Sequence, residues 1–576
     1  MPSCRPGLTA VGNLANATMP SPASPTFAQS VELATARANR YAASRTLVWT
    51  AFTLLYVIPT VLLSRIKLFW DDEFFTLYLS RTADWKTLLQ ALATGADQHP
   101  PSFYYLTHGI LGLFGTSPVT LRLTAIAGFW LLCVCLYEIL KPLTNPMWAV
   151  VAMLLPLTTP LYYYAMEARA YGLVVGFIAL AALSWFRASA FHRRGVYLPL
   201  LALSLAGAVA SHYYASMAVV CLALGELVRT GTRRRIDWPI WVAFAFAALP
   251  ILLFFQTIQS AKGYSTHFWA VPIWSDAIYF YPAELGSGPI VVLGALGVVL
   301  CFRISLGTQK KAWKGVDRKA PLNLWQVTAT CALSALPVLV MTIAKSVTHG
   351  FADRYAISAI VGVSVLLSYL LYRVMPHPRA AVAASAICIA MFGFQVHKFR
   401  DTFQDHRDSM AGDIRNLSET RDQPVAMMGI TVFHRLSFYA PRQLASRLAY
   451  LSDPDTSIQY IGHDTIDRGL LDLDPWFPIN VIPMRSFLEA NREFLAYGNT
   501  NHWSWLTFEL PKWGQTKLLG RREHECLLFS VTDVHPPPGA DVPPQLRWTS
   551  SSMLYTKMPQ TGPSLCERYM GAKNCP

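Results

Sequence analysis

The sequence predicts an α-helical integral membrane protein with about eleven spans, followed by an extracytoplasmic α/β domain. Composition is the first observation behind this prediction. Of the 576 residues, 53% are hydrophobic and 14% are charged, whereas about a quarter of the residues of a soluble domain are charged. The second observation is that long apolar runs alternate with short basic segments, as the positive-inside rule describes for membrane proteins.

Apolar runs that could cross a bilayer recur about eleven times, although several are shorter than the ~20 residues of a straight span. The predicted spans are Thr46–Leu63, Leu123–Leu140, Met147–Tyr163, Tyr171–Phe186, Val196–Ala210, Tyr213–Val228, Trp238–Phe255, Ile290–Phe302, Leu322–Ile343, Tyr355–Tyr372 and Ala380–Val396. A further apolar run, Ser102–Phe114, is about thirteen residues long and carries His108. Because a span needs more residues than this, we interpret it as an interfacial or re-entrant helix.

Basic residues orient the predicted spans. With residues 1–44 in the cytoplasm, every strong basic cluster between spans falls on the cytoplasmic side. These clusters comprise Lys141, the segment Arg187–Arg194, the segment Arg229–Arg235, the segment Arg303–Lys319, and the pair Arg373 and Arg379. The sequence thus predicts a multi-pass protein of the cell membrane (the inner or plasma membrane) with a cytoplasmic N-terminus.

Three parts of the chain follow from this topology. Residues 1–44 are polar and are predicted to form a flexible cytoplasmic tail. Residues 45–398 form the membrane domain, whose first outer loop comprises residues 64–122. Residues 399–576 form the extracytoplasmic domain, in which residues 424–430 and 526–531 resemble strands and Met484–Tyr497 resembles a helix. If that domain is extracytoplasmic, Cys566 and Cys575 could form a disulfide.

Composition also argues against two classes of function. The formal net charge is +14, but the basic residues do not alternate with stacking aromatic residues, so the sequence predicts no nucleic-acid binding. The chain has 10 cysteines, and none of them lies in a spacing that is typical of a zinc site.

Each predicted outer turn carries an ionisable residue beside aromatic residues. The first outer loop holds three consecutive carboxylates, which repel one another and are poorly solvated at a membrane edge. The candidate site residues are Asp71, Asp72, Glu73, His99, Tyr104 and Tyr105 in the first outer loop, Glu167 and Arg169 in the second, His212 in the third, Lys262 and His267 in the fourth, and Asp353 and Arg354 in the fifth. The alternative is that the charged residues end helices or pair at the surface, and that the aromatic residues form the usual interfacial belt.

This set of residues suits the transfer of a group from a lipid phosphate. A carboxylate can take a proton from an acceptor hydroxyl as the hydroxyl attacks an electrophilic carbon. Arginine and histidine side chains can stabilise the negative charge on a departing phosphate. A site at the membrane surface also lets a lipid-linked substrate enter from the bilayer.

Five motifs occur in an order that resembles the membrane glycosyltransferases of family 39. The motifs are Trp70–Thr76, His99–Tyr105, Glu167–Tyr171, Ser211–Ala215 and Asp353–Tyr355. The family has the GT-C fold and includes protein O-mannosyltransferases and the aminoarabinose transferases that modify lipid A. The resemblance covers about residues 45–400 and implies a GT-C bundle. It also implies an enzyme that uses a polyprenyl-phosphate-linked sugar donor, usually with inversion, on the outer side of the membrane.

The resemblance also implies roles for particular residues. The Asp-Glu pair of the family's first loop matches Asp72 and Glu73, so Asp72 is the expected general base and Glu73 orients it or holds a cation. Asp71 adds a third carboxylate and leaves the choice of base open. Glu167, Arg169 and Arg354 match donor-pocket positions, and the other candidates listed above are expected to assist there.

The sequence leaves several alternatives open. A divalent cation at Asp72 and Glu73 is one of them, and no other cofactor is implied. The expected partners are the polyprenyl-phosphate-linked donor, membrane lipids, and an acceptor that is a lipid, a glycan or a protein. A transporter or lipid flippase is the competing function, although such proteins usually place ionisable residues near the bilayer midplane and often contain inverted repeats. An inactive scaffold that binds a partner is a third.

Overall fold

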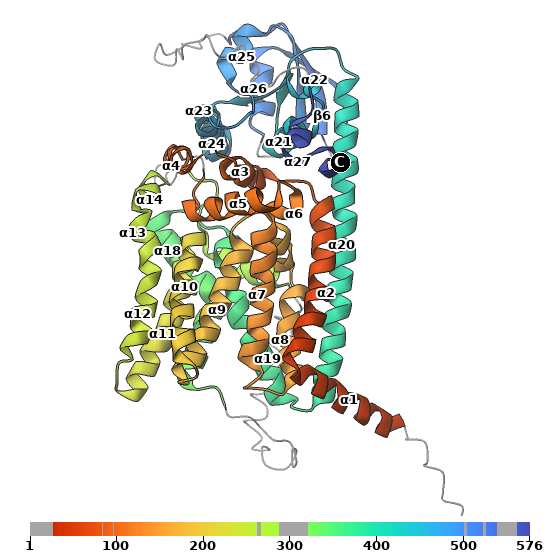
Figure 1. Ribbon diagram of the computed structural model, residues 1–576. Helices are drawn as coiled ribbons and strands as arrows, with labels where there is room; N and C mark the ends of the chain where they lie inside the picture. The colour runs from red at the N-terminus through yellow and green to blue at the C-terminus, as the bar shows by residue number, and fades with distance from the viewer. Residues whose placement is uncertain are drawn as a thin grey trace, which may run out of the picture.

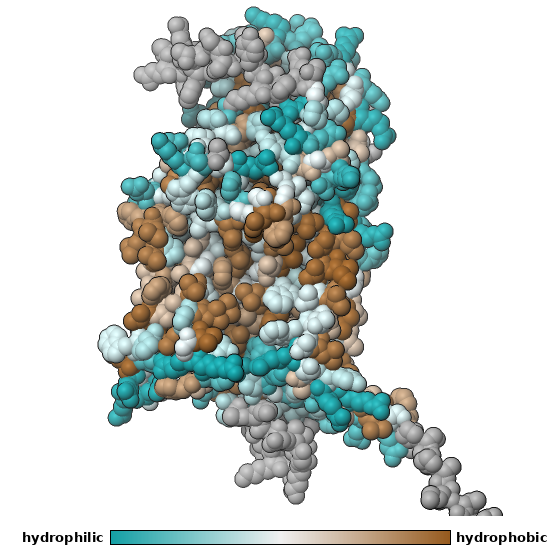
Figure 2. Space-filling view, in the orientation of Figure 1, coloured by the Kyte–Doolittle hydropathy of each residue, from teal (hydrophilic) through white to brown (hydrophobic). Residues whose placement is uncertain are grey.

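The computed structural model describes residues 27–82, 84–95, 97–261, 267–286, 288, 321–499, 504–521, 526–537 and 562–576. These residues form a bundle of helices with an α/β domain at one of its ends (Figure 1). On the face shown in Figure 2, an apolar band lies across the bundle between two hydrophilic ends. The prediction of an α-helical membrane bundle followed by an α/β domain is therefore confirmed.

Six helices of the described chain are long and apolar enough to cross a bilayer, and the number rises to 8 if each of two bent helix pairs forms one span. The six are α2 (Arg45–Ile66), α7 (Leu123–Leu140), α9 (Tyr171–Ser189), α10 (Arg194–Ser211), α11 (Ala215–Arg233) and α20 (Pro378–Ser418). Two shorter apolar segments lie at Trp238–Leu253, which comprises α12 (Trp238–Ala245), η3 (Phe246–Ala248) and α13 (Leu249–Leu253), and at α19 (Ala359–Val374). The predicted span Ile290–Phe302 lies outside the described residues, so the predicted count of eleven is not confirmed.

Proline interrupts two of the predicted spans. The predicted span Met147–Tyr163 consists of α8 (Pro146–Leu154), η1 (Leu155–Thr158) and η2 (Pro160–Met166), with a bend of 77° between η1 and η2. The predicted span Leu322–Ile343 consists of α17 (Leu324–Ser334) and α18 (Leu336–Ile343) and bends by 59°. Each bend falls beside a proline, Pro160 or Pro337, which has no backbone N–H to continue the helical hydrogen bonds. A straight span was therefore the wrong expectation at these two places.

The end of the bundle opposite the α/β domain carries the basic residues. Residues 27–43 form helix α1 (Phe27–Ala43), which packs against α2, α8 and α20, so the predicted flexible tail is wrong for that part. Its alanine-rich sequence favours a helix. Arg45 and Arg187 both pair with Glu138, with N–O distances of 2.8 Å and 3.5 Å. Lys141 donates to the carbonyl oxygen of Ala43 at 2.7 Å. These contacts bring the basic ends of α2, α7 and α9 together.

The first outer loop is mostly helical. It contains α3 (Asp71–Ser80), α4 (Trp85–Ala93), α5 (Pro101–Phe114) and α6 (Pro118–Leu121). Helix α5 lies across the end of the bundle rather than along it (Figure 1), which agrees with the interfacial interpretation of that apolar run. The outer connections also contain α14 (Phe255–Ala261), α15 (Trp274–Phe280), η5 (Tyr281–Leu285), η6 (Ala344–Thr348) and η7 (Asp353–Ala356).

Helix α20 joins the two halves of the protein. Its 41 residues span about 60 Å at 1.5 Å per residue. The helix runs beside α2 along the bundle and continues into the α/β domain (Figure 1). The boundary predicted between residues 398 and 399 therefore falls inside a continuous helix.

The α/β domain is built on a six-stranded sheet of order β3-β2-β1-β4-β6-β5, in which β1 to β4 are parallel and β5 and β6 are antiparallel to their neighbours. Its elements are β1 (Val425–Met427), α21 (Ile430–Tyr439), α22 (Arg442–Ala445), β2 (Leu448–Ser452), α23 (Pro454–Ile461), α24 (Thr465–Leu473), β3 (Val481–Pro483), α25 (Met484–Ala490), β4 (Phe494–Asn499), α26 (Leu506–Trp513), β5 (Gln515–Arg521), β6 (Cys526–Thr532), α27 (Leu565–Met570) and η11 (Ala572–Asn574). The two predicted strands correspond to β1 and β6.

Two further expectations concern this domain. The predicted helix Met484–Tyr497 is wrong in its second half, because α25 ends at Ala490 and β4 begins at Phe494. Strand β4 lies between β1 and β6 and is buried, so sheet pairing outweighs the helical tendency of the segment. The disulfide between Cys566 and Cys575 is present.

Glycine allows α7 and α9 to pack closely. A Cβ atom added to Gly176 would overlap the carbonyl oxygen of Gly128, and one added to Gly128 would overlap the carbonyl oxygen of Gly172. Small residues four positions apart on one helix are the usual means of close helix packing in membranes. The two helices lie beneath the outer turns that carry the candidate site, so this contact sets the spacing of those turns.

We expect Gly176→Val to destabilise the bundle by roughly 1–3 kcal/mol, as overpacking of a close contact does. Thermal unfolding of the detergent-purified protein measures the effect as a lower Tm. Gly393→Val on α20 is the matched control, because a Cβ at Gly393 meets nothing within 4 Å. Equal Tm values for the two variants would contradict the assigned packing.

Candidate active site

The three consecutive carboxylates of the first outer loop point in different directions. They occupy the first turn of α3, where successive residues are about 100° apart around the helix axis. Asp71 contacts the α/β domain, Asp72 faces the other outer turns, and Glu73 points into the protein. The sequence predicted Asp72 as the base but left the role of Asp71 open, whereas the helix gives each of the three carboxylates a different set of partners.

Glu73 is the centre of a buried ion cluster. Its carboxylate accepts from Nε of Arg122 at 2.7 Å, from Nζ of Lys67 at 2.7 Å and from the backbone N–H of Ala168 at 2.8 Å. Burial alone would raise the pKa of this carboxyl group, but Arg122 and Lys67 outweigh it and hold the pKa at about 2. Glu73 is therefore an ion at neutral pH, and both of its oxygens are occupied.

Arg122 extends the cluster to the end of α2. Its guanidinium also donates to the carbonyl oxygens of Ser64 at 2.6 Å and Lys67 at 3.1 Å, which lie in the last turn of α2 and just after it. A positive charge is favourable there because it opposes the helix dipole. The cluster thus joins α2, α3, the start of α7 and the second outer turn. The sequence analysis identified neither Arg122 nor Lys67 as a site residue.

Asp72 lies between two arginines from different outer turns. Its Oδ2 is 3.4 Å from a terminal nitrogen of Arg354 and 3.8 Å from Nε of Arg169. The Asp72 side chain is 17% exposed, whereas the Arg169 side chain is 4% exposed. Oδ2 of Asp72, Nε of Arg169 and Nε of Arg354 are buried and make no hydrogen bond in the described chain. Such groups are costly to bury without a partner, so this is the place where a polar ligand would complete the structure.

Asp97 organises the wall behind Arg169, and the sequence analysis missed it. Arg169 donates to both Asp97 oxygens and to Nδ1 of His99, the last at 2.8 Å. The hydroxyl of Tyr104 also donates to Asp97. Burial would raise the pKa of Asp97, but Arg169 and His99 lower it well below its ordinary value. Asp97 and His99 therefore hold the guanidinium of Arg169 in one orientation.

Histidine and aromatic rings continue from His99 along the site. The rings of His99 and His212 lie 4.8 Å apart, and His212 lies 5.3 Å from the ring of Tyr355. Burial is the main cause that lowers the pKa of both histidines, so both imidazoles are neutral at neutral pH. Neutral rings beside Arg169 and Arg354 add no further positive charge, and they can still donate or accept a hydrogen bond.

Arg354 is surrounded by aromatic faces. Its guanidinium carbon lies 5.6 Å from the ring centre of Trp269, 5.7 Å from that of Trp70 and 6.0 Å from that of Tyr171. These three rings come from the fourth, first and second outer turns. Cation–π contacts of this kind stabilise a guanidinium while leaving its edge free to bind an anion.

Glu167 lies behind the cluster, buried, with one carboxylate oxygen that makes no hydrogen bond. Burial raises the pKa of Glu167, while the nearby Lys67 lowers it. The structure therefore places Glu167 beside the Glu73 cluster rather than against Arg169, two residues along the chain.

Three other candidates do not join the cluster, and a fourth is not described. Tyr105 is 55% exposed and packs edge-to-face against Trp85, because it lies about 100° around the axis of α5 from the buried Tyr104. Asp353 is partly buried, and burial together with Asp276 raises its pKa. His267 lines a cavity of about 550 Å³ with Lys345 and His349 beside the α/β domain. Lys262 lies outside the described residues.

A divalent cation at Asp72 and Glu73 does not fit the geometry. Glu73 is occupied by Lys67 and Arg122, and Asp72 faces two arginines. Within the described ranges, no group of three or more His, Cys, Asp or Glu side chains is arranged to hold a metal ion. Asp72 and Glu73 are thus held apart by cations of the protein itself.

Comparisons with known proteins identify the fold of this chain. A family model described as dolichyl-phosphate-mannose-protein mannosyltransferase matches residues 98–257. The chain also resembles the crystal structure of ArnT from Cupriavidus metallidurans in the apo state, with 12% identity and a TM-score of 0.50, over 84% of this chain and 99% of ArnT. This chain has the GT-C fold of the membrane glycosyltransferases.

Other GT-C structures match less closely. ArnT bound to undecaprenyl phosphate gives 11% identity and a TM-score of 0.49, with 84% of this chain and 99% of ArnT covered. The oligosaccharyltransferase of Archaeoglobus fulgidus in complex with zinc and sulfate gives 13% identity and a TM-score of 0.39, with 80% of this chain and 71% of that chain covered. No curated protein sequence matches the chain.

We expect Glu73→Gln to destabilise the protein by roughly 3–5 kcal/mol, because it leaves two buried cations without their counter-charge. Thermal unfolding of the purified protein measures this loss. Glu419→Gln, which neutralises an exposed carboxylate just after α20, is the matched control and should leave the Tm unchanged.

The effect of pH gives a second measure of the same cluster. The folded-state pKa of Glu73, at about 2, is below its ordinary value of 4.5, so the stabilisation is complete above pH 4.5 and is lost as the pH falls toward 2. The difference in stability between wild type and Glu73→Gln should therefore be constant above pH 4.5 and decrease below it. A difference that stays constant to the lowest pH would contradict an ionised Glu73.

Proposed function

We propose that this GT-C protein transfers a sugar from a polyprenyl-phosphate-linked donor to a hydroxyl or amine of an acceptor, with Asp72 as the general base. The observation that carries the proposal is the position of Asp72. Its carboxylate lies between Arg169 and Arg354 at the end of the bundle, and its Oδ2 makes no hydrogen bond with the described residues. Attack on a carbon that bears a phosphate needs a base to take the proton of the acceptor and cationic groups to stabilise the departing phosphate, and this arrangement supplies both.

In the proposed reaction the acceptor oxygen or nitrogen attacks the anomeric carbon of the donor. A bond forms between these two atoms while the bond from the anomeric carbon to the phosphate oxygen breaks, with inversion at the carbon. Asp72 takes the proton from the acceptor. The electron pair of the broken bond remains on the polyprenyl phosphate, which leaves as an anion.

Arg354 and Arg169 would bind the phosphate of the donor. Arg169 is aligned by Asp97 and His99, and Arg354 is enclosed by aromatic rings. Each guanidinium retains a buried Nε that makes no hydrogen bond with the described residues. Charge-assisted hydrogen bonds to phosphate suit this geometry. Ion pairing with the phosphate would also weaken the hold of both arginines on Asp72, which makes Asp72 a better base once the donor is bound.

The comparisons and the position of the site support the proposal of a polyprenyl-linked donor. One of the similar structures is ArnT bound to undecaprenyl phosphate, and another is an archaeal oligosaccharyltransferase in complex with a dolichol-phosphate. The described cluster lies at the ends of α9 and α10, where the apolar band meets the hydrophilic end (Figures 1 and 2). A lipid chain could remain in the bilayer while its phosphate reaches Arg354. We propose that this end faces outward, since the basic residues lie at the other end.

A transporter fits this arrangement less well. Transporters usually bind their substrate near the bilayer midplane. In this chain Asp72, Asp97, Arg169 and Arg354 all lie in the connections at one end of the bundle, and none of them belongs to a candidate span.

We expect Asp72→Asn to lower kcat for sugar transfer by roughly 10²–10⁴-fold, which is the usual contribution of a general base. The assay uses purified protein with a labelled polyprenyl-phospho-sugar and a hydroxyl-bearing acceptor. Asp455→Asn, at an exposed position on α23, is the control and should retain the wild-type kcat. Normal turnover by Asp72→Asn would overturn the assignment of the base. A solute that crosses liposomes without consumption of donor would instead favour a transporter.

We expect Arg354→Gln to weaken binding of undecaprenyl phosphate by roughly 10- to 100-fold, which corresponds to the loss of a hydrogen bond to a charged group. Quenching of tryptophan fluorescence by the added lipid is a suitable measurement, since Trp70 and Trp269 lie against Arg354. Arg235→Gln removes an exposed arginine between α11 and α12 and should leave binding unchanged. Equal affinities for the two variants would remove Arg354 from the donor site.

A further inference from the structure

Asp71 is the one carboxylate of the first outer loop that the proposed reaction does not use. Its Oδ2 accepts a hydrogen bond from the hydroxyl of Thr431 at 2.6 Å, and its Oδ1 lies 3.2 Å from Nδ1 of His434. Both partners belong to α21 of the α/β domain. The residue next to the proposed base is therefore bound by a helix that follows it by about 360 residues in the chain.

The same helix also contacts the backbone before α3. The backbone N–H of Phe69 donates to the hydroxyl of Tyr439 at 3.1 Å, and the carbonyl oxygen of Phe69 accepts from Nε of Arg435 at 3.1 Å. Helix α21 thus binds both the backbone N–H and the backbone carbonyl of Phe69. Together with Asp71, α21 makes polar contacts on both sides of Trp70.

Aromatic packing fills the space between the two helices. The ring of Phe69 lies 5.9 Å from that of Phe438, and the ring of Phe74 lies 5.2 Å from that of Phe438 and 5.4 Å from that of His434. Phe69, Phe74, His434 and Phe438 are all buried. The interface between α3 and α21 therefore combines apolar contact with directed hydrogen bonds, which is the combination that fixes a helix in one orientation.

Asp72 itself is held less tightly than its neighbours. It lies between Asp71, bound to α21, and Glu73, bound to the buried ion cluster, while its own contacts with Arg169 and Arg354 are 3.8 Å and 3.4 Å long. Without the contacts of Asp71, α21 would still bind the backbone of Phe69, but it would make no polar contact with the first turn of α3 itself. Because a general base must lie within hydrogen-bond reach of the proton it accepts, a small rotation of that turn would slow the chemical step.

We propose that α21 of the α/β domain positions the first turn of α3, with Thr431, His434 and Arg435 acting as positioning residues for Asp72. This inference rests on the proposed role of Asp72. It assigns the α/β domain a function in the transfer reaction that is independent of acceptor binding.

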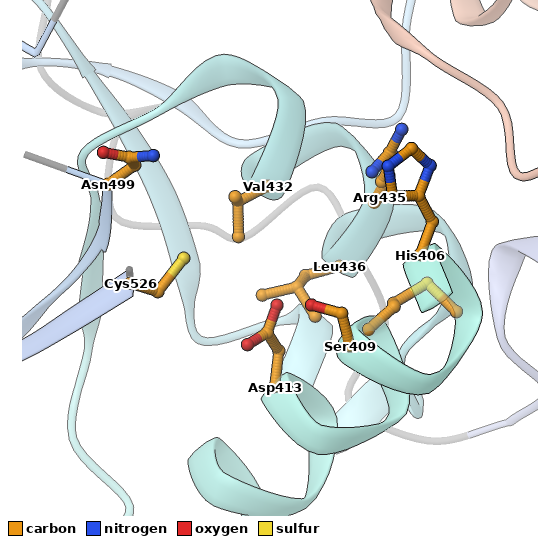
Figure 3. Close-up of a pocket in the computed structure, with 9 residues that line it drawn as sticks. His406, Ser409, Asp413, Val432, Arg435, Leu436, Asn499 and Cys526 are labelled. Carbon is orange, nitrogen blue, oxygen red and sulfur yellow. The ribbon is translucent and has the colours of Figure 1, made fainter. Parts of the chain in front are cut away.

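One face of α21 borders a cavity. The cavity has a volume of about 230 Å³ and lies between α20, α21 and the sheet; its lining includes Ser409 and Asp413 of α20, and Arg435 and Leu436 of α21. Figure 3 shows Arg435 beside His406 at one end of this cavity. Arg435 thus lines this cavity and also donates to the backbone carbonyl oxygen of Phe69.

The decisive variant is Thr431→Val/His434→Phe, which removes both partners of Asp71 and keeps the side-chain volumes similar. We expect kcat to fall by roughly 10- to 100-fold, the effect of a misplacement of about 1 Å, while the KM for the donor stays within about twofold because Arg169 and Arg354 are untouched. Thr431→Ser/His434→Gln retains hydrogen-bond donors at both positions and should restore most of kcat. Thr456→Val/His535→Phe makes the same two substitutions elsewhere in the domain, away from α3, and is the matched control.

Hydrogen exchange separates this inference from the proposed function. Amides of residues 71–76 should exchange faster in Thr431→Val/His434→Phe than in wild type or in the matched control, whether or not the protein transfers sugar. If the wild type transfers no sugar but exchange is faster in Thr431→Val/His434→Phe, the proposed function is overturned and the positioning of α3 by α21 is supported. Unchanged exchange in Thr431→Val/His434→Phe, or a kcat of this variant equal to that of the matched control, would overturn the positioning role of α21.

Discussion

The arrangement of the bundle end that carries the candidate site depends on the buried carboxylate of Glu73. Moving a carboxylate out of water is costly, and the cost is offset here by Arg122, Lys67 and a backbone N–H. Each of these donors comes from a different part of the chain. The cluster therefore holds the end of α2, the start of α7 and the second outer turn at fixed distances from α3. Replacing one member would leave the others charged and buried, so the cluster favours this arrangement of the helices over others as well as stabilising it.

The directions of the neighbouring side chains follow from this anchor. With Glu73 directed inward, the helix geometry of α3 turns Asp72 toward Arg169 and Arg354 and turns Asp71 toward α21. One short helix thus contributes to the ion cluster, to the candidate active site and to the contact with the α/β domain. The GT-C bundle supplies the remaining members of the site, because its outer turns converge on the same place.

Much of the fold followed from the sequence, because hydropathy and basic segments report directly on contact with lipid and water. The bounds of α7 agree with the predicted span, and those of α2 and α9 differ by a few residues. The errors have physical causes. Pro160 and Pro337 bend two segments of apolar composition, and β4 was missed because sheet pairing decided a segment whose local preference is helical.

The candidate site was predictable in part. Asp72, Arg169, His99, His212 and Arg354 lie in short motifs beside aromatic residues, and the structure brings them together. Asp97, Arg122 and Lys67 lie in no such motif, although Arg122 and Lys67 are buried and the Asp97 side chain is only 10% exposed. A charged residue that looks solvated in the sequence can be buried only if partners from other elements surround it, and a sequence does not show those partners in advance.

The sequence by itself determined the membrane class, the position of most spans, and the ring of ionisable residues at the outer turns, since these depend on composition and on local order along the chain. Only the tertiary structure decided which of the three carboxylates faces the arginines, because that depends on how α3 is rotated about its axis. The rotation is set by contacts of Glu73 with Arg122 and of Asp71 with Thr431, which join residues 49 and 360 positions apart.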